Sequence, residues 1–147
     1  MNRFELRPSV GAGDLTFTLN QEQARYLLGP PHKSYRNWQG KVGDVWNGVA
    51  VSYSPADGMI DEIVLSSPSI ALFGGRDLLS CDDAVELVQR IDPNPKAWMG
   101  SVVFLEARMS LKGLLHPEDA RAVALGRQGH WTEYANRMTA LDSEGTN

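Results

Sequence analysis

An internal similarity at a fixed offset constrains this chain more than any other feature of its sequence. The segment Ala24–Leu28, which has helical patterning, is followed sixty positions later by the similar segment Ala84–Val88, and Ile63–Leu65 is followed at the same offset by Val123–Leu125. A single repeat usually cannot bury its own apolar face and needs a neighbour to complete a core. We therefore expect two similar units that share one hydrophobic core.

The pattern of helical and strand segments predicts an α+β fold. In each unit an amphipathic helix precedes three strands, which gives tandem α-β-β-β repeats that form antiparallel sheet with the helices packed on one face. A chain of 147 residues buries about 68–70% of the surface that it exposes when unfolded, so it needs neither disulfides nor a metal to fold. We expect a single domain over residues 1–138, with repeats at about 14–68 and 74–127, a short closing helix at 130–138 and a disordered tail at 139–147.

Both helices have identifiable boundaries. Asn20 is the expected N-cap of the first helix and Gln23 its capping-box partner, while Gly29 and the two prolines after it end the helix. Ser80 is the expected N-cap of the second helix, which has acidic residues in its first turn. We expect the inner faces of the helices to consist of Ala24, Leu27, Leu28, Ala84, Leu87, Val88 and Ile91.

The strands are predicted from period-two patterns and turn residues. In the segment 44–53, alternate apolar residues fall on one face, and the Asp57–Gly58 pair that follows indicates a hairpin. Trp46 and Trp98 are expected near the start of their strands. The expected strands lie at 3–7, 15–19, 33–39, 44–53, 59–66, 70–73, 98–106, 108–115 and 120–127.

Composition and charge narrow the classes of partner. The net charge is −4, whereas nucleic-acid binders usually carry a basic surface that neutralises phosphates, so we expect no nucleic-acid partner. An acidic balance is compatible with a basic protein partner. The lone cysteine excludes an intramolecular disulfide, and the start of the chain lacks the apolar core of a secretory signal. With no run of about 18 apolar residues to span a bilayer, we expect a cytoplasmic protein.

Few residues form a pattern that carries chemistry. Cys81 lies where a helix N-terminus would lower a thiol pKa, but Asp82 and Asp83 oppose a thiolate and His32, His116 and His130 are distant in sequence. No histidine or cysteine pair has the spacing of metal ligands, and Gly74–Arg76 lacks the pattern of a phosphate loop. We expect no catalytic residue, metal or cofactor; a small enzyme with a Cys81/histidine site is the alternative.

Five residues are candidates for contact with a protein partner. Trp38 and Trp131 lie in polar sequence surroundings, where a tryptophan serves either as an interface anchor or as a core residue. Asp57, Asp61 and Glu62 form an acidic segment that is either solvated surface or a recognition patch for a basic partner.

The segment Tyr26–Pro31, a helix end of the form Leu-Gly-x-Pro followed by antiparallel strands, resembles a pattern in small bacterial helix–sheet modules. These modules include outer-membrane assembly lipoproteins, tandem-repeat inhibitors of the β-lactamase inhibitor protein type and toxin-system immunity proteins. Unlike the first two, this chain lacks a lipidated cysteine and disulfides. The resemblance implies a protein that binds and neutralises a toxin, in the manner of an immunity protein. A structural subunit or a small-ligand module remains an alternative.

Overall fold

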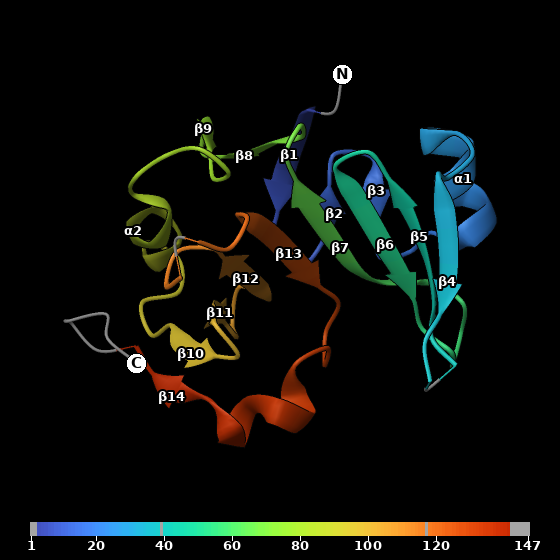
Figure 1. The fold of residues 1–147 in the computed structure, drawn as a ribbon. Coiled ribbons are helices and arrows are strands. Elements are labelled where there is room, and N and C mark those ends of the chain that lie inside the picture. Colours follow the sequence, from blue (N-terminus) through green and yellow to red (C-terminus); the bar gives the residue numbers. More distant parts are fainter. Residues whose placement is uncertain (1–2, 39, 117, 142–147) are drawn as a thin grey trace.

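The computed structural model describes residues 3–38, 40–116 and 118–141, which form two antiparallel-rich sheets and a few short helices (Figure 1). The larger sheet has the strand order β14-β10-β11-β12-β13-β7-β6-β5-β4, and the smaller has the order β3-β2-β1-β8-β9. Among the described strands, β1 and β8 form the one parallel pair. The α+β class is therefore confirmed.

The elements are β1 Arg3–Arg7, β2 Gly11–Ala12, β3 Leu15–Thr16, α1 Gln21–Leu28, β4 Lys33–Arg36, β5 Val42–Trp46, β6 Val49–Tyr53, β7 Ile60–Ser66, β8 Ile70–Phe73, β9 Arg76–Asp77, α2 Ala84–Gln89, β10 Lys96–Trp98, β11 Ser101–Phe104, β12 Met109–Lys112, β13 Ala122–Gly126, the 3₁₀ helix η1 Thr132–Arg137 and β14 Thr139–Ala140.

The two faces of the nine-stranded sheet bury different clusters. Strand residues alternate between the faces, and the inner face carries a row of paired side chains that crosses the sheet from Phe104 on β11 to Val51 on β6. The members of this row, in order, are Phe104, Met109, Leu125, Ile63 and Val51, with Asp44 of β5 next to Val51. Buried residues of α1, α2 and the smaller sheet belong to the same cluster. The main core therefore lies on the face that both helices share.

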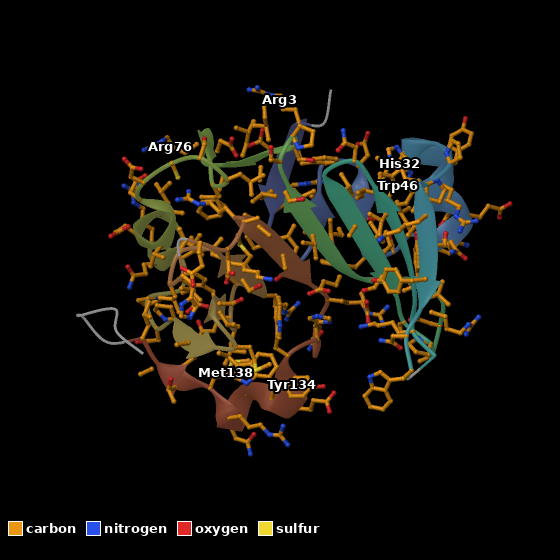
Figure 2. All side chains as sticks on the ribbon, in the orientation of Figure 1. Arg3, His32, Trp46, Arg76, Tyr134 and Met138 are labelled. Atoms are coloured by element: carbon orange, nitrogen blue, oxygen red, sulfur yellow. The ribbon has the colours of Figure 1, made fainter. Side chains whose placement is uncertain are left out.

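A smaller cluster lies on the outer face. Val103 of β11 and Ala124 of β13 pack there with Trp131 and Met138, which flank η1. Figure 2 shows Tyr134 and Met138 on this closing segment, at the opposite end of the molecule from Trp46, whose Nε1 donates a hydrogen bond to the carbonyl of Gly29. The closing helix predicted at 130–138 is thus present as a 3₁₀ helix over the β10–β13 half of the sheet.

Each helix is followed by four consecutive antiparallel strands of the larger sheet, β4–β7 after α1 and β10–β13 after α2, rather than the expected three. The segment 44–53 is a hairpin rather than one strand: it turns at Asn47–Gly48, where Gly48 has φ +82°. In the second unit the expected strand 98–106 is also interrupted, by a turn at Met99–Gly100 between β10 and β11 in which both residues have positive φ. Trp46 and Trp98 therefore end their strands, and the prediction that they start them was wrong. Asn-Gly is a strong signal for a two-residue hairpin turn, and it outweighs the apolar alternation across the segment.

The first helix has the predicted boundaries, whereas the second differs from its prediction. Asn20 and Gln23 form the reciprocal capping box, and Gly29 is the C-cap. The N-cap of α2 is Asp83 rather than Ser80, because the Asp77 carboxylate accepts bonds from Leu79 and Ser80 and holds that segment in a turn. Two expected inner-face residues also differ from the prediction, since Leu27 is 44% exposed and Ile91 is 51% exposed.

The end of the described chain extends the larger sheet. Thr139 and Ala140, expected in a tail, pair with Ala97 and Lys96 of β10. The remainder of the expected tail, 142–147, lies outside the described residues. None of the helices in the described part of the chain is long and apolar enough to cross a membrane.

Candidate functional site

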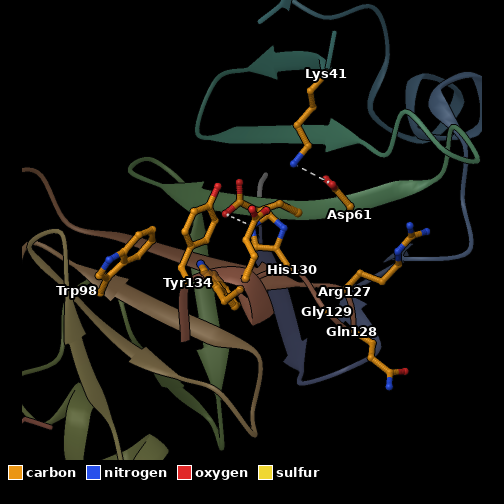
Figure 3. A pocket seen from close by; sticks show the side chains of 11 residues that line it. Lys41, Asp61, Trp98, Arg127, Gln128, Gly129, His130 and Tyr134 are labelled. Carbon is orange, nitrogen blue, oxygen red and sulfur yellow. Dashed lines mark hydrogen bonds and ion pairs between the residues drawn. The ribbon is translucent and has the colours of Figure 1, made fainter. Parts of the chain in front are cut away.

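A cavity of about 490 Å³ opens on the outer side of the larger sheet, between β7, the loop after β13 and η1 (Figure 3). Lys41, at the start of the β5 hairpin arm, reaches toward Asp61 from one side, while Trp98, Tyr134 and His130 line the other. The site thus joins residues from both halves of the chain. We call it the outer cavity.

A β-bulge brings two adjacent carboxylates to the outer cavity. Ser52 of β6 pairs with Glu62 and Tyr53 pairs with Ile60, so Asp61 is an extra residue on β7. In a regular strand Asp61 and Glu62 would point to opposite faces, but a bulge re-aims one of them. Both line the cavity. The same bulge explains how Ile60 and Ile63, three residues apart, are both fully buried in the inner core.

Ion pairs fix the charged groups around the cavity. Lys41 Nζ lies 2.8 Å from Asp61 Oδ2, and Ser52 Oγ donates to Asp61 Oδ1 at 2.8 Å. His130 Nε2 and Glu62 Oε2 are 3.1 Å apart. Arg127 Nη1 donates to Asp57 Oδ2 at 3.0 Å, which links the β6–β7 turn to the loop after β13. The lining is therefore held in place before any partner binds.

The loop after β13 depends on a small residue at the strand end. A Cβ on Gly126 would come within 2.8 Å of the Trp131 ring and 3.0 Å of the His130 Cβ. The glycine therefore allows Trp131 and His130 to fold back over the strand. The Arg127 amide then continues the ladder by donating to the carbonyl of Asp61 at 2.9 Å. This local arrangement points His130 at Glu62.

Aromatic rings form a wall of the outer cavity. Trp98 and Tyr134 stack with centroids 4.8 Å apart, and His130 meets Trp131 edge-on at 4.7 Å. The Arg137 guanidinium carbon lies 6.0 Å from the Tyr134 centroid. Trp131 is only 9% exposed and contributes mainly to the outer cluster.

The structure gathers most of the predicted contact residues in one place. Asp61, Glu62 and Trp131 line the outer cavity, and Asp57 joins it through Arg127. Trp38 is 90% exposed, in the loop that leads to Lys41, and that loop is closed by hydrogen bonds between Asn37 and Lys41.

Sequence reasoning missed eight further lining residues. Six of them follow one another closely along the chain after β13: Arg127, Gln128, Gly129, His130, Glu133 and Tyr134. Strand pairing between distant segments brings Lys41 and Trp98 to this segment. One signal for the bulge was available in the sequence: Ile60 and Ile63 are three residues apart, so a regular strand would point them to opposite faces.

A separate carboxylate, Asp44, is fully buried on the inner face. It accepts hydrogen bonds from Arg25 through both oxygens, from Ser34 at 2.6 Å and from Tyr53 at 3.0 Å. Burial alone would raise the pKa of Asp44, but these donors outweigh burial and hold the pKa at about 2. Burial and the nearby carboxylate raise the pKa of the Tyr53 hydroxyl. The cluster attaches α1 to the sheet and is a structural element.

Cys81 lacks the environment of a reactive thiol. It lies two positions before Asp83, the N-cap of α2, and burial together with Asp83 raises its pKa instead of lowering it. Among the described residues, no group of three or more histidine, cysteine or carboxylate side chains is arranged to hold a metal ion.

Comparisons with known proteins add no relative to this description. No protein-family model, curated protein or solved structure matches the chain.

Proposed function

We propose that this is a cytoplasmic protein-binding module that neutralises a cognate toxin domain, in the manner of a bacterial immunity protein, and that the outer cavity with Trp38 is its contact surface. The observation that carries the proposal is the convergence of Asp61, Glu62 and Trp131 in the lining of one cavity, to which Asp57 is linked by its ion pair with Arg127. Trp38, the fifth predicted residue, is on the loop that supplies Lys41 to the same cavity.

The chemistry of the outer cavity favours recognition. Apart from Glu133, its charged groups are held in pairs, so a partner would meet a surface most of whose charged side chains have already lost their freedom, which lowers the entropic cost of association. An exposed tryptophan beside such a surface is a frequent interface anchor. A neutralising protein needs a rigid complementary surface and no reactive group.

A small-ligand module is the second candidate, and cavity size is the observation that favours it. Ligand pockets commonly enclose about 300–1,000 Å³, and the outer cavity has about 490 Å³. Such pockets are mostly apolar with a few polar groups, whereas charged residues from four segments line this one. We therefore place protein binding first. The raised pKa of Cys81 weighs against the Cys81/histidine enzyme.

We also infer that the fold arose by tandem duplication. Val64 pairs with Ala124 at the junction of β7 and β13, and these two residues are related by the sixty-residue offset seen in the sequence. Four consecutive antiparallel strands of the larger sheet follow each helix, β4–β7 after α1 and β10–β13 after α2, before β8 and β14 respectively. A neutralising module built in this way would carry its contact surface across both repeats.

The direct test is capture of the partner from the native host. The full chain, immobilised through an added tag, should retain one protein whose expression alone arrests growth, and co-expression of the full chain should restore growth. Capture of no protein, or of one whose toxicity the chain leaves unchanged, would contradict the immunity function. A small molecule retained instead would favour the second candidate.

A further inference from the structure

The outer cavity carries more negative than positive charge. Three carboxylates line it, from Asp61, Glu62 and Glu133, against the two permanent cations Lys41 and Arg127, and Arg127 is paired with Asp57 outside the lining. Each of these cations already has a carboxylate of its own at 2.8 or 3.0 Å. Among the described residues, the two carboxylates of the lining that have no permanent cation as a partner are therefore Glu62, which is paired only with His130, and Glu133.

Glu62 is well placed to accept a further hydrogen bond. Its contact with His130 uses Oε2, whereas an ionised carboxylate has two oxygens with about four acceptor positions. The Glu62 side chain is 27% exposed and lies on β7, so it is partly desolvated yet open to the cavity. A charge-assisted bond in such a partly shielded site is stronger than the same bond in open water.

The aromatic part of the lining suits a flat cation. Trp98 and Tyr134 stack there, and the molecule's own Arg137 guanidinium lies near the Tyr134 ring. Guanidinium groups pack against aromatic side chains and bind carboxylates in a planar fork, whereas an ammonium group acts as a compact, strongly hydrated point charge. This arrangement favours arginine over lysine.

On this basis we propose that the outer cavity receives an arginine side chain of the partner protein, with Glu62 and Glu133 as its acceptors and Trp98 and Tyr134 as its apolar wall. The inference rests on the proposed function for the identity of the partner, but its chemistry can be tested without that partner. The occupant is thus a basic segment on the partner surface.

The experiment is a titration of the full chain with the peptide acetyl-Gly-Arg-Gly-amide, followed by NMR of the Trp98 indole and Tyr134 ring signals. We expect saturable shifts with this peptide. The matched peptide with citrulline, which keeps the shape of arginine without its charge, should bind at least about tenfold more weakly, because bonds to charged groups are the stronger class. The comparison uses the unaltered protein and so does not depend on a variant that folds.

A pair of variants locates the binding. Glu62→Gln keeps the size of the side chain and should weaken arginine-peptide binding about tenfold. Glu86→Gln, at an exposed position on α2, should bind as the unaltered chain does, because α2 packs against the inner-face core and contributes no residue to the cavity lining. Absence of saturable shifts, equal binding of the citrulline peptide, or preferential binding of acetyl-Gly-Glu-Gly-amide would overturn the inference. If a toxin is captured but the arginine peptide causes no saturable shifts, the arginine site is rejected and the immunity function stands. If the arginine peptide binds but no toxin is captured, the immunity function is rejected and the arginine site stands.

Discussion

Asp44 illustrates how one side chain can fix the position of a helix. Its carboxylate has no exposed surface, and the cost of burying its charge is met by bonds from Arg25 of α1, Ser34 of β4 and Tyr53 of β6. Three elements therefore meet at one charged group. Removing a charged acceptor of this kind leaves several donors without a strong partner, which is more costly than losing a surface ion pair.

Asp44→Asn should lower the free energy of unfolding by about 3 kcal/mol at neutral pH. Because the pKa of Asp44 in the folded protein is depressed to about 2, its stabilisation is fully present above the unfolded pKa near 4 and is lost as the pH falls through about 2. Denaturant unfolding from pH 7 to pH 2 should show a constant difference between the two proteins above about pH 4 that narrows below it. Asp57→Asn, at a half-exposed ion pair, is the control and should change stability by about 0.5 kcal/mol or less. A difference that stays constant down to pH 2 would contradict this account of Asp44.

Cys81 gives a second prediction at the residue scale. Since burial and Asp83 raise its pKa, little thiolate exists at neutral pH, and alkylation by iodoacetamide should be slower than that of a free cysteine in a peptide. Cys81→Ser should preserve binding of the captured partner. Fast labelling together with loss of activity in a folded Cys81→Ser protein would place the Cys81/histidine enzyme ahead of the binding function.

At the scale of the elements, local signals predicted some boundaries and tertiary pairing decided the others. The caps of α1 and the strand at Arg3–Arg7 follow from nearby residues and agree with the structure. The predicted N-cap of α2, Ser80, disagrees with the structure, because the Asp77 side chain organises the turn before the helix. The bulge at Asp61 required knowledge of the strand partner, which the sequence shows only through the spacing of Ile60 and Ile63.

The two helices offer a matched test of burial. Leu27 and Leu87 are related by the sixty-residue offset, yet Leu27 is 44% exposed and Leu87 is 5% exposed. Leu87→Ala should cost about 2–5 kcal/mol of unfolding free energy, whereas Leu27→Ala should cost about 0.5 kcal/mol. Chemical denaturation of both variants measures the difference. Equal costs would show that Leu27 is as deeply buried as Leu87 and that the two helices pack alike.

At the scale of the whole molecule, the halves depend on each other. β7 pairs with β13 over five residues, from Glu62 to Ser66, and β1 pairs with β8. The offset in the sequence indicated a shared core, but the order of the strands and the convergence of both halves at the outer cavity follow only from long-range pairing.

Residues 1–68 alone should therefore lack a cooperative unfolding transition. Cutting there removes β13, one of the two strands that pair with β7, and leaves Ile63 and Leu65 without their neighbours on β13. The full chain should unfold in one sigmoidal step under the same conditions, as followed by far-ultraviolet circular dichroism. A native-like transition for the fragment would contradict the shared core.

The central claim is that the outer cavity and Trp38 form the surface that binds a partner protein. The most direct measurement is the dissociation constant of the captured partner for two matched variants, Trp38→Ala and Tyr26→Ala, whose side chains are 90% and 89% exposed. An anchor residue contributes about 2 kcal/mol or more, so Trp38→Ala should weaken binding at least about thirtyfold, while Tyr26→Ala on α1 should leave it unchanged. Equal affinities for the two variants, or a loss confined to Tyr26→Ala, would contradict the account and move the contact surface away from the outer cavity.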